Sequence, residues 1–206
     1  MRSFVAVELP EPILEAVGQL SGRLRASGAR VTWIKPENMH LTLRFLGEID
    51  EDNINRLKAI LSDAYRGMSP FTLSVRGVGA FPNMRRPSVV WVGAVEAREA
   101  GEARSQVQLG NERALGDDRA EAIETAYLAA ESAARAIGLP PEEKAFHPHL
   151  TLARIKDARE APPLVACLER ERDFCAGDFT VHSVSLFSSR LTPHGPIYQR
   201  IEEFTF

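Results

Sequence analysis

The sequence predicts an α+β fold with two pseudo-symmetric lobes, each a mostly antiparallel sheet with outer helices, around a central cleft. One observation is that the tetrapeptide His-Leu-Thr-Leu occurs twice, at residues 40–43 and 149–152. A second is that a Phe-Thr pair opens a strand-like segment 31 residues after His40 and 30 residues after His149. A third is that strand-like and helix-like segments alternate with hairpin turns, which is typical of α+β proteins. The matched spacing indicates a duplication with two units, within one domain spanning 1–206.

Hydrophobic spacing and turn residues define the elements of the first half. Pro10 and Pro12 end a buried strand and open a helix, because proline suits the first helical turn. Asp50 or Asp52 is expected to cap a later helix, since aspartate accepts hydrogen bonds from free helical N–H groups. The predicted elements are a strand at 4–9, a helix from 10 to 24, a short strand at 31–34, the first His-Leu-Thr-Leu strand to Gly47, a helix carrying 54–61, and strands at 71–75 and 89–92.

The second half repeats this order after an interruption. Residues 96–118 are rich in alanine, glutamate, arginine, glycine and glutamine, and we expect a mobile, solvated insertion there. Gly138 and Pro140 end the helix that follows the insertion. The predicted elements are a helix at 119–137, the second His-Leu-Thr-Leu strand, a helix through 165–169, a strand at 179–186, and a closing strand at 197–206.

Composition excludes several classes of protein. The chain has 206 residues, 44% of them hydrophobic and 26% charged, with a net charge of −3. No global positive field attracts nucleic acid, so an RNA ligand must be held locally, at an end or a single phosphate. No apolar run approaches the roughly 20 residues that span a bilayer, and the N-terminus does not resemble a signal peptide. Cys167 and Cys175 form no metal-binding CxxC motif, so we expect a reducing cytoplasm as the setting. We also expect a monomer with no membrane partner.

Each His-Leu-Thr-Leu copy presents an imidazole and a hydroxyl on one face of its strand. Side chains at i and i+2 share a face, so His40 lies with Thr42 and His149 with Thr151, opposite the leucines. If the two strands lie side by side, the two imidazoles converge on one point. Two histidines with a pKa near 6.5 can divide acid and base roles at neutral pH, and the threonines can bind phosphate oxygens. The competing interpretation is a pair of hydrogen-bonded core histidines with ordinary strand threonines.

A strained 2′,3′-cyclic phosphate suits such a pair, and no metal is needed to activate water. His147 and His149 form an H-x-H pair that could bind zinc, but no cysteine or carboxylate accompanies them. We therefore expect no metal and no cofactor, and place His147 at the edge of the cleft.

The two motifs and their flanks resemble those of a known family. Both copies resemble the paired His-x-Thr-x signatures of the two-histidine (2H) phosphoesterases. Residues 38–48, NMHLTLRFLGE, and 146–154, FHPHLTLAR, are similar to the two motifs of the bacterial and archaeal RNA 2′,3′-cyclic phosphodiesterases, once called 2′-5′ RNA ligases. Residues 195–198, GPIY, resemble the final hairpin of that family. The likeness covers nearly the whole chain, and the insertion at 96–118 departs from it.

The resemblance implies hydrolysis of a 2′,3′-cyclic phosphate at an RNA end to a 2′-phosphate. His40 would be the proton donor to the leaving 3′-oxygen, and His149 the proton acceptor that activates water. The sequence does not orient the substrate, so the reverse assignment stays open. Members of the family also join certain tRNA halves through a 2′-5′ bond, because the same pair serves both directions.

We expect further substrate contacts at Arg154, Arg44, His147 and Tyr198. Arg154 is a phosphate or ribose contact by resemblance, but it lies five residues after His149, so only a strand end or bulge could turn it to the same face. Arg44 lies four residues after His40, on the same face by parity, and could instead be a surface arginine. Tyr198, Phe45, Trp33 and Trp91 could stack on a base, although core packing is the simpler interpretation of each.

Two other functions remain open from sequence. One is a 2H phosphoesterase that acts on a small cyclic nucleotide such as ADP-ribose 1″,2″-cyclic phosphate, or that trims RNA 3′ ends. The other is an RNA-binding or nucleotide-binding module that has lost turnover, which the intact histidines and threonines in both copies disfavour.

Overall fold

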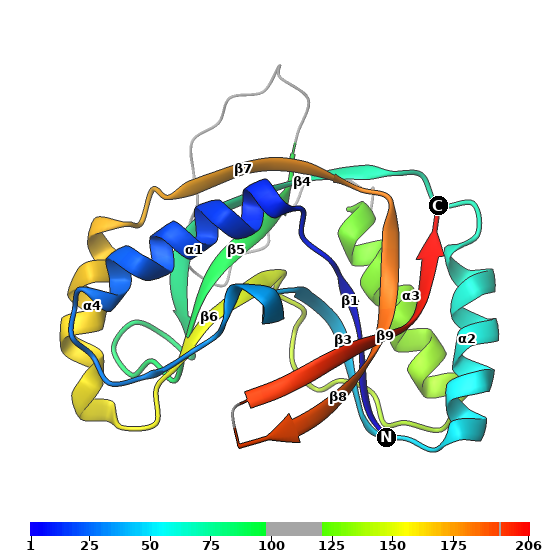
Figure 1. The fold of residues 1–206 in the computed structure, drawn as a ribbon. Coiled ribbons are helices and arrows are strands. Elements are labelled where there is room, and N and C mark those ends of the chain that lie inside the picture. Colours follow the sequence, from blue (N-terminus) through cyan, green and yellow to red (C-terminus); the bar gives the residue numbers. More distant parts are fainter. Residues whose placement is uncertain (98–120, 194) are drawn as a thin grey trace.

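The computed structural model describes residues 1–97, 121–193 and 195–206 (Figure 1). The predicted insertion at 96–118 lies outside these residues, apart from Glu96 and Ala97. Glu96 ends a strand, and its carboxylate accepts hydrogen bonds from the backbone N–H of Ala122, at the start of the next described helix. Among the described residues, no helix is long and apolar enough to cross a membrane.

Helices and strands alternate along the described chain, as the sequence predicts. The helices are α1 (Glu11–Arg25), α2 (Glu51–Tyr65), α3 (Ala122–Ala136) and α4 (Ala161–Arg170), with short 3₁₀ turns η1 (Pro36–Asn38) and η2 (Ala158–Glu160). The strands are β1 (Arg2–Val7), β2 (Thr32–Trp33), β3 (Leu41–Glu48), β4 (Phe71–Phe81), β5 (Val89–Glu96), β6 (His149–Arg154), β7 (Cys175–Val181), β8 (Ser183–Thr192) and β9 (Gly195–Thr205). The Asp50 side chain caps α2 by accepting from the Asn53 N–H at 2.8 Å, so Asp50 is the cap of the two candidates.

The strands form one nine-stranded sheet in the order β7-β4-β5-β6-β3-β1-β8-β9, with β2 paired to β6. All of its pairings are antiparallel. The α+β prediction is therefore confirmed, and the two lobes are halves of a continuous sheet. We call β3, β1, β8 and β9 the first lobe, and β6, β5, β4 and β7 with β2 the second lobe. The lobes meet at β3 and β6, where a single residue pair, Leu41 with Leu150, is in register.

The lobes do not follow the boundary between the sequence repeats. Helix α3 contacts β3 and α2, and α2 contacts β9, so these two helices cover the first lobe. Helix α1 contacts β7 and α4, so those two cover the second lobe (Figure 1). Each lobe is thus built from both halves of the chain. The equivalent Phe-Thr strands of the two repeats even pair with each other, with Thr72 opposite Thr180.

One predicted strand is divided in two. The sequence predicts a single strand at 179–186, whereas β7 ends at Val181 and β8 begins at Ser183. The break has a structural reason, because β7 pairs with β4 in the second lobe while β8 pairs with β1 in the first. The chain passes from one lobe to the other at this point.

The four helices pack on one face of the sheet, where their apolar stripes meet the buried strand residues in one core. Both leucines of each His-Leu-Thr-Leu copy belong to this core and are at most 4% exposed. Burying a leucine completely is worth about 1.5–3 kcal/mol, so this core fixes which way both strands face. The other face of the sheet is the one we call the open face.

Candidate active site

The structure places the two His-Leu-Thr-Leu copies side by side. Leu41 pairs with Leu150 in an antiparallel register, and this register sets His40 across from Thr151 and Thr42 across from His149. The leucines point into the core, so all four polar side chains lie on the open face, because neighbouring residues of a strand alternate in direction. The arrangement has a local two-fold symmetry, with one imidazole and one hydroxyl from each repeat.

Both imidazole rings are held by the same kind of contact. Nδ1 of His40 lies 2.9 Å from the carbonyl oxygen of Asn38, and Nδ1 of His149 lies 2.6 Å from the carbonyl oxygen of His147. A carbonyl oxygen can only accept, so Nδ1 carries the hydrogen in each ring. Nε2 of each neutral ring is then the nitrogen with a free lone pair, which can take up a proton and, once protonated, deliver it.

Burial makes both rings poor bases in the ligand-free protein. It lowers the pKa of His40 from 6.5 to about 4, opposed by the hydrogen bond to Asn38. It also lowers the pKa of His149, opposed by the hydrogen bond to the His147 carbonyl and assisted by the charges of His147 and Arg154. Both histidines are therefore neutral at pH 7 until an anion binds beside them.

Aromatic rings surround His40 on the open face of the first lobe. The ring of Phe4 is stacked on His40 with centroids 4.6 Å apart, and Tyr198 meets it edge-on at 5.2 Å. Burial raises the pKa of the Tyr198 hydroxyl, opposed by the positive charges of Arg154 and Arg2. Tyr198 therefore lies beside His40 and within electrostatic range of two arginines, at the position where the sequence predicts a substrate contact.

Aromatic rings also surround His149, on the second lobe. Phe81 meets the His149 ring edge-on at 5.0 Å, and Trp91 lies 6.4 Å away. The indole of Trp91 lies across Gly79, where a Cβ would overlap the ring. Glycine at this position therefore allows Trp91 to lie flat against β4. The indole N–H is buried and has no hydrogen-bond partner in the described part of the chain.

The two threonines lie on the open face as predicted. Thr42 and Thr151 are both partly exposed. Within the described residues, neither hydroxyl makes a hydrogen bond to the protein, so both can donate to a ligand.

Arg154 is turned to the open face by a β-bulge. The pairing of β6 with β5 shifts by one residue after Thr151, leaving Leu152 unpaired. Leu152 and Ala153 are consequently both buried, and Arg154 is exposed. The bulge reverses the simple alternation, so Arg154 shares the face of His149, and its charge acts on that ring.

Arg44 is turned the opposite way, and its expected place beside His40 is wrong. The pairing of β3 with β1 skips Leu43, so Arg44 points to the helix side and is only 7% exposed. Its guanidinium forms ion pairs with Glu131 at 2.5 Å and Glu142 at 3.2 Å, and donates to the Pro140 carbonyl at 2.6 Å. These partners balance the charge of the guanidinium inside the protein, so Arg44 ties α3 and the segment leading to β6 to the first lobe.

His147 is exposed, beside Phe81 at 5.9 Å between ring centroids. It lies at the edge of the site, in keeping with the sequence prediction. The described residues contain no cluster of three or more histidine, cysteine, aspartate or glutamate side chains able to hold a metal ion.

Sequence reasoning missed three contributors to this site. Phe4 was predicted only as part of a buried strand, yet its ring supports His40. The carbonyls of Asn38 and His147 orient the two rings, and no side-chain pattern reports a backbone acceptor. The side chain of Asn38 also donates to the Pro196 carbonyl at 3.2 Å, which links the turn before His40 to the β8–β9 hairpin.

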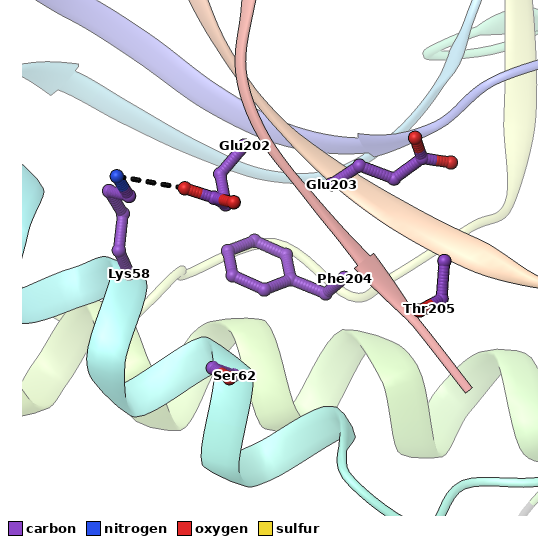
Figure 2. A pocket seen from close by; sticks show the side chains of 6 residues that line it. All are labelled: Lys58, Ser62, Glu202, Glu203, Phe204 and Thr205. Carbon is purple, nitrogen blue, oxygen red and sulfur yellow. Dashed lines mark ion pairs between the residues drawn. The ribbon is translucent and has the colours of Figure 1, made fainter.

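A surface hollow of about 370 Å³ lies elsewhere, between α2 and β9 (Figure 2). Lys58 and Glu202 form a 2.8 Å ion pair beside it, and no residue of either His-Leu-Thr-Leu copy lines it. Its charged side chains are already paired, Lys58 with Glu202 and Glu203 with Arg200, so we assign the chemistry to the two motifs instead.

The fold and the paired motifs define a class, the phosphoesterases. The family described as LigT-like phosphoesterase matches residues 7–91 and 117–198, so the chain belongs to that family. A protein of Methanothermobacter thermautotrophicus called RNA 2′,3′-cyclic phosphodiesterase is 33% identical over 204 residues, covering 99% of this chain and 98% of that one. A protein of the same description from Aeropyrum pernix is 38% identical over 195 residues, covering 91% and 94%.

Solved structures agree with this assignment. The crystal structure of TT0787 of Thermus thermophilus matches with a TM-score of 0.75 and 28% identity, covering 100% of this chain and 97% of that one. The structure of Escherichia coli LigT complexed with 3′-AMP matches with a TM-score of 0.69 and the same coverage. Its 21% identity supports the fold alone.

Proposed function

We propose that this phosphoesterase hydrolyses the 2′,3′-cyclic phosphate at an RNA end to a 2′-phosphate, with two histidines as its proton-transfer groups and no metal. Water attacks phosphorus and loses a proton to Nε2 of His149. The bond from phosphorus to the 3′-oxygen breaks, and Nε2 of His40 protonates that oxygen. The product carries a 2′-phosphate monoester and a free 3′-hydroxyl, so protons and charge balance.

The observation that carries the proposal is the Leu41–Leu150 register. It brings two imidazoles and two hydroxyls to one face, and each ring has Nδ1 engaged and Nε2 free. In this assignment, Thr42 and Thr151 donate to the non-bridging oxygens. Arg154 supplies a positive charge to the phosphate or ribose end, and Tyr198 and His147 border the substrate. The relatives that bear the name RNA 2′,3′-cyclic phosphodiesterase cover nearly the whole chain and support the choice of substrate.

The low pKa of His40 sets a condition on the mechanism. A proton donor must be charged before it acts, and burial lowers the pKa of His40 to about 4. A bound phosphate diester places a negative charge next to the ring, which favours the imidazolium form. Substrate binding therefore charges the donor, and the two rings titrate as one coupled pair.

The test is incubation with 2′,3′-cyclic AMP and with an RNA oligonucleotide ending in a 2′,3′-cyclic phosphate, followed by identification of the product. We expect a 2′-phosphate, activity that survives EDTA, and loss of activity in His40→Ala and in His149→Ala. A 3′-phosphate product would reverse the assigned polarity, and abolition of turnover by EDTA would refute the metal-free mechanism. Turnover that prefers the mononucleotide over the oligonucleotide would indicate a small cyclic nucleotide as the substrate.

A sulfur substitution separates the roles of the two histidines. Replacing the 3′-oxygen by sulfur gives a leaving group that departs without protonation. This substrate should restore turnover in His40→Ala and leave His149→Ala inactive, and the opposite pattern would exchange the two roles. Supplying a 5′-hydroxyl oligonucleotide in place of water as the nucleophile tests whether the same pair also forms a 2′-5′ bond.

A further inference from the structure

The loop that joins β4 to β5 presents two arginines that the proposed chemistry does not use. Arg85 and Arg86 are both exposed, whereas Met84 before them packs against the core and Pro87 after them is buried. The side-chain oxygen of Asn83 accepts hydrogen bonds from the backbone N–H groups of both arginines, at 3.0 and 3.1 Å. The loop is therefore anchored on both sides of the pair, and it holds the two guanidinium groups next to each other in solvent.

The base of this loop belongs to the active site. The carbonyl of Phe81 accepts hydrogen bonds from the N–H and the hydroxyl of Ser88, at 2.7 and 3.0 Å, which closes the loop. The ring of Phe81 also meets the ring of His149 edge-on at 5.0 Å. At the other end of the loop, the carbonyl of Ser88 accepts from the N–H of Ile155 at 2.9 Å, one residue after Arg154. The loop thus begins beside His149 and ends beside Arg154.

Four positive charges gather without partners at this end of the second lobe. Arg85, Arg86, Arg154 and Lys156 are exposed, and none of them forms an ion pair with another residue in the part of the chain that the structure describes. Asp157, which follows them in the chain, is already engaged in an ion pair of its own. The whole chain has a net charge of −3, so this local excess of cations attracts an anion to one place rather than to the whole surface.

We propose that Arg85 and Arg86 bind the phosphate that joins the terminal nucleotide of an RNA to the nucleotide before it. The subsite rests on the proposed function, which puts the cyclic phosphate between His40 and His149, with Arg154 beside it. In an RNA end, one sugar separates the cyclic phosphate from the next phosphate, so a strand that leaves across the second lobe carries this second anion past Arg154 to the loop.

Guanidinium groups suit such a contact, because each can donate two parallel hydrogen bonds to phosphate oxygens. A contact to the backbone carries no sequence information. The subsite therefore distinguishes an oligonucleotide from a mononucleotide, and it accepts any base in the preceding nucleotide.

The experiment compares wild-type protein with the double variants Arg85→Gln/Arg86→Gln and Arg85→Lys/Arg86→Lys on three substrates. These are 2′,3′-cyclic AMP, which lacks the second phosphate, a dinucleotide ending in a 2′,3′-cyclic phosphate, and the same dinucleotide with a neutral methylphosphonate linkage. The first sugar of both dinucleotides is deoxyribose, so that no neighbouring hydroxyl attacks the methylphosphonate.

For the glutamine variant we expect kcat/KM on the charged dinucleotide to fall about tenfold, mainly through KM, and to be unchanged on the other two substrates. The slope of log kcat/KM against log salt concentration on the charged dinucleotide should become shallower by about 0.7, the value for one phosphate of a single strand. The lysine variant keeps the charge and loses the planar fork, so its kcat/KM should lie between those of the other two proteins.

The matched control is Arg135→Gln/Arg170→Gln. Both arginines are exposed, in the last turns of α3 and α4, so the control removes the same two charges from the helix side of the sheet. It should behave as wild type on all three substrates. A loss equal to that of the loop variant would assign the effect to net charge and overturn the subsite.

Three further results would overturn it. They are an equal loss on cyclic AMP, an equal loss on the neutral dinucleotide, or no loss on the charged dinucleotide. Calorimetric binding of 2′-AMP and of the dinucleotide 2′-phosphate separates this proposal from the function itself. If wild-type protein turned over none of the substrates, the proposed function would fail, while weaker binding of the dinucleotide alone by the glutamine variant would still support the contact. Equal binding of the dinucleotide by both proteins would refute it.

Discussion

The buried ring of His40 predicts a specific dependence of stability on pH. The pKa of His40 is about 4 in the folded protein and near 6.5 in the unfolded chain, where the ring is solvated. Between these values the unfolded chain binds more protons, so folding stability is complete above pH 6.5 and is lost as the pH falls toward 4. One pKa unit corresponds to 1.36 kcal/mol, so this group alone removes about 3 kcal/mol of stability by pH 4.

The variant His40→Asn isolates this contribution. Asparagine keeps an N–H near the Asn38 carbonyl and does not titrate, while His149 titrates in both proteins and cancels in the comparison. Urea unfolding at pH 7.5 and pH 4 gives the free energy of unfolding of each protein. We expect the wild-type protein to lose about 3 kcal/mol more than the variant between these pH values. Equal losses in the two proteins would show that the folded ring titrates normally and that burial does not govern its charge.

Two further substitutions test the packing around the site. Arg44→Met should lower the free energy of unfolding by about 3–5 kcal/mol, because it leaves the buried carboxylate of Glu131 without its partner. Urea titrations measure this loss, and a value under about 1 kcal/mol would show that the ion-pair network is solvated. Gly79→Ala should displace the Trp91 indole, change its fluorescence and cost about 1–3 kcal/mol, as overpacking does. The same change at Gly22, in an α1 position where a Cβ meets nothing within 4 Å, should instead be neutral or stabilising, and similar effects at both sites would contradict the packing argument.

The class of fold and the paired motifs could be predicted from sequence because both depend on local periodicity. The leucines of each His-Leu-Thr-Leu copy are at most 4% exposed, and their burial places the histidine and threonine that alternate with them on the opposite face of the strand. Helix caps and turns could be predicted for the same reason, because the residues involved are close in sequence. Asp50, for example, accepts a hydrogen bond from the N–H of Asn53. The path of the chain between the lobes depends instead on contacts between residues far apart in the sequence. Nothing in the spacing of the repeats says that β4 of the first repeat pairs with β7 of the second.

The arginines show where alternation fails. Parity from His40 placed Arg44 on the open face, and parity from His149 placed Arg154 on the opposite face, and the structure reverses both. Each reversal has the same cause, a bulge at the last leucine of the motif. A bulge inserts one residue without changing the composition of a strand, so a sequence pattern with period two cannot reveal it. In β6, the only feature of the sequence that breaks the alternation at the bulge is the pair of consecutive apolar residues Leu152 and Ala153.

The single residue pair between β3 and β6 has a mechanical consequence. Every other pairing along the order β7 to β9 spans four or more residues, so each lobe is stiffened by its own ladder of hydrogen bonds. The junction of Leu41 and Leu150 has no such ladder, so backbone hydrogen bonding resists a change in the angle between the lobes least at this pair. His40 directly precedes one of the two joined strands and His149 begins the other, so a change in that angle would change the gap between their Nε2 atoms while both lobes keep their shape. An anion bound by both imidazoles would bridge this junction and set the angle between the lobes.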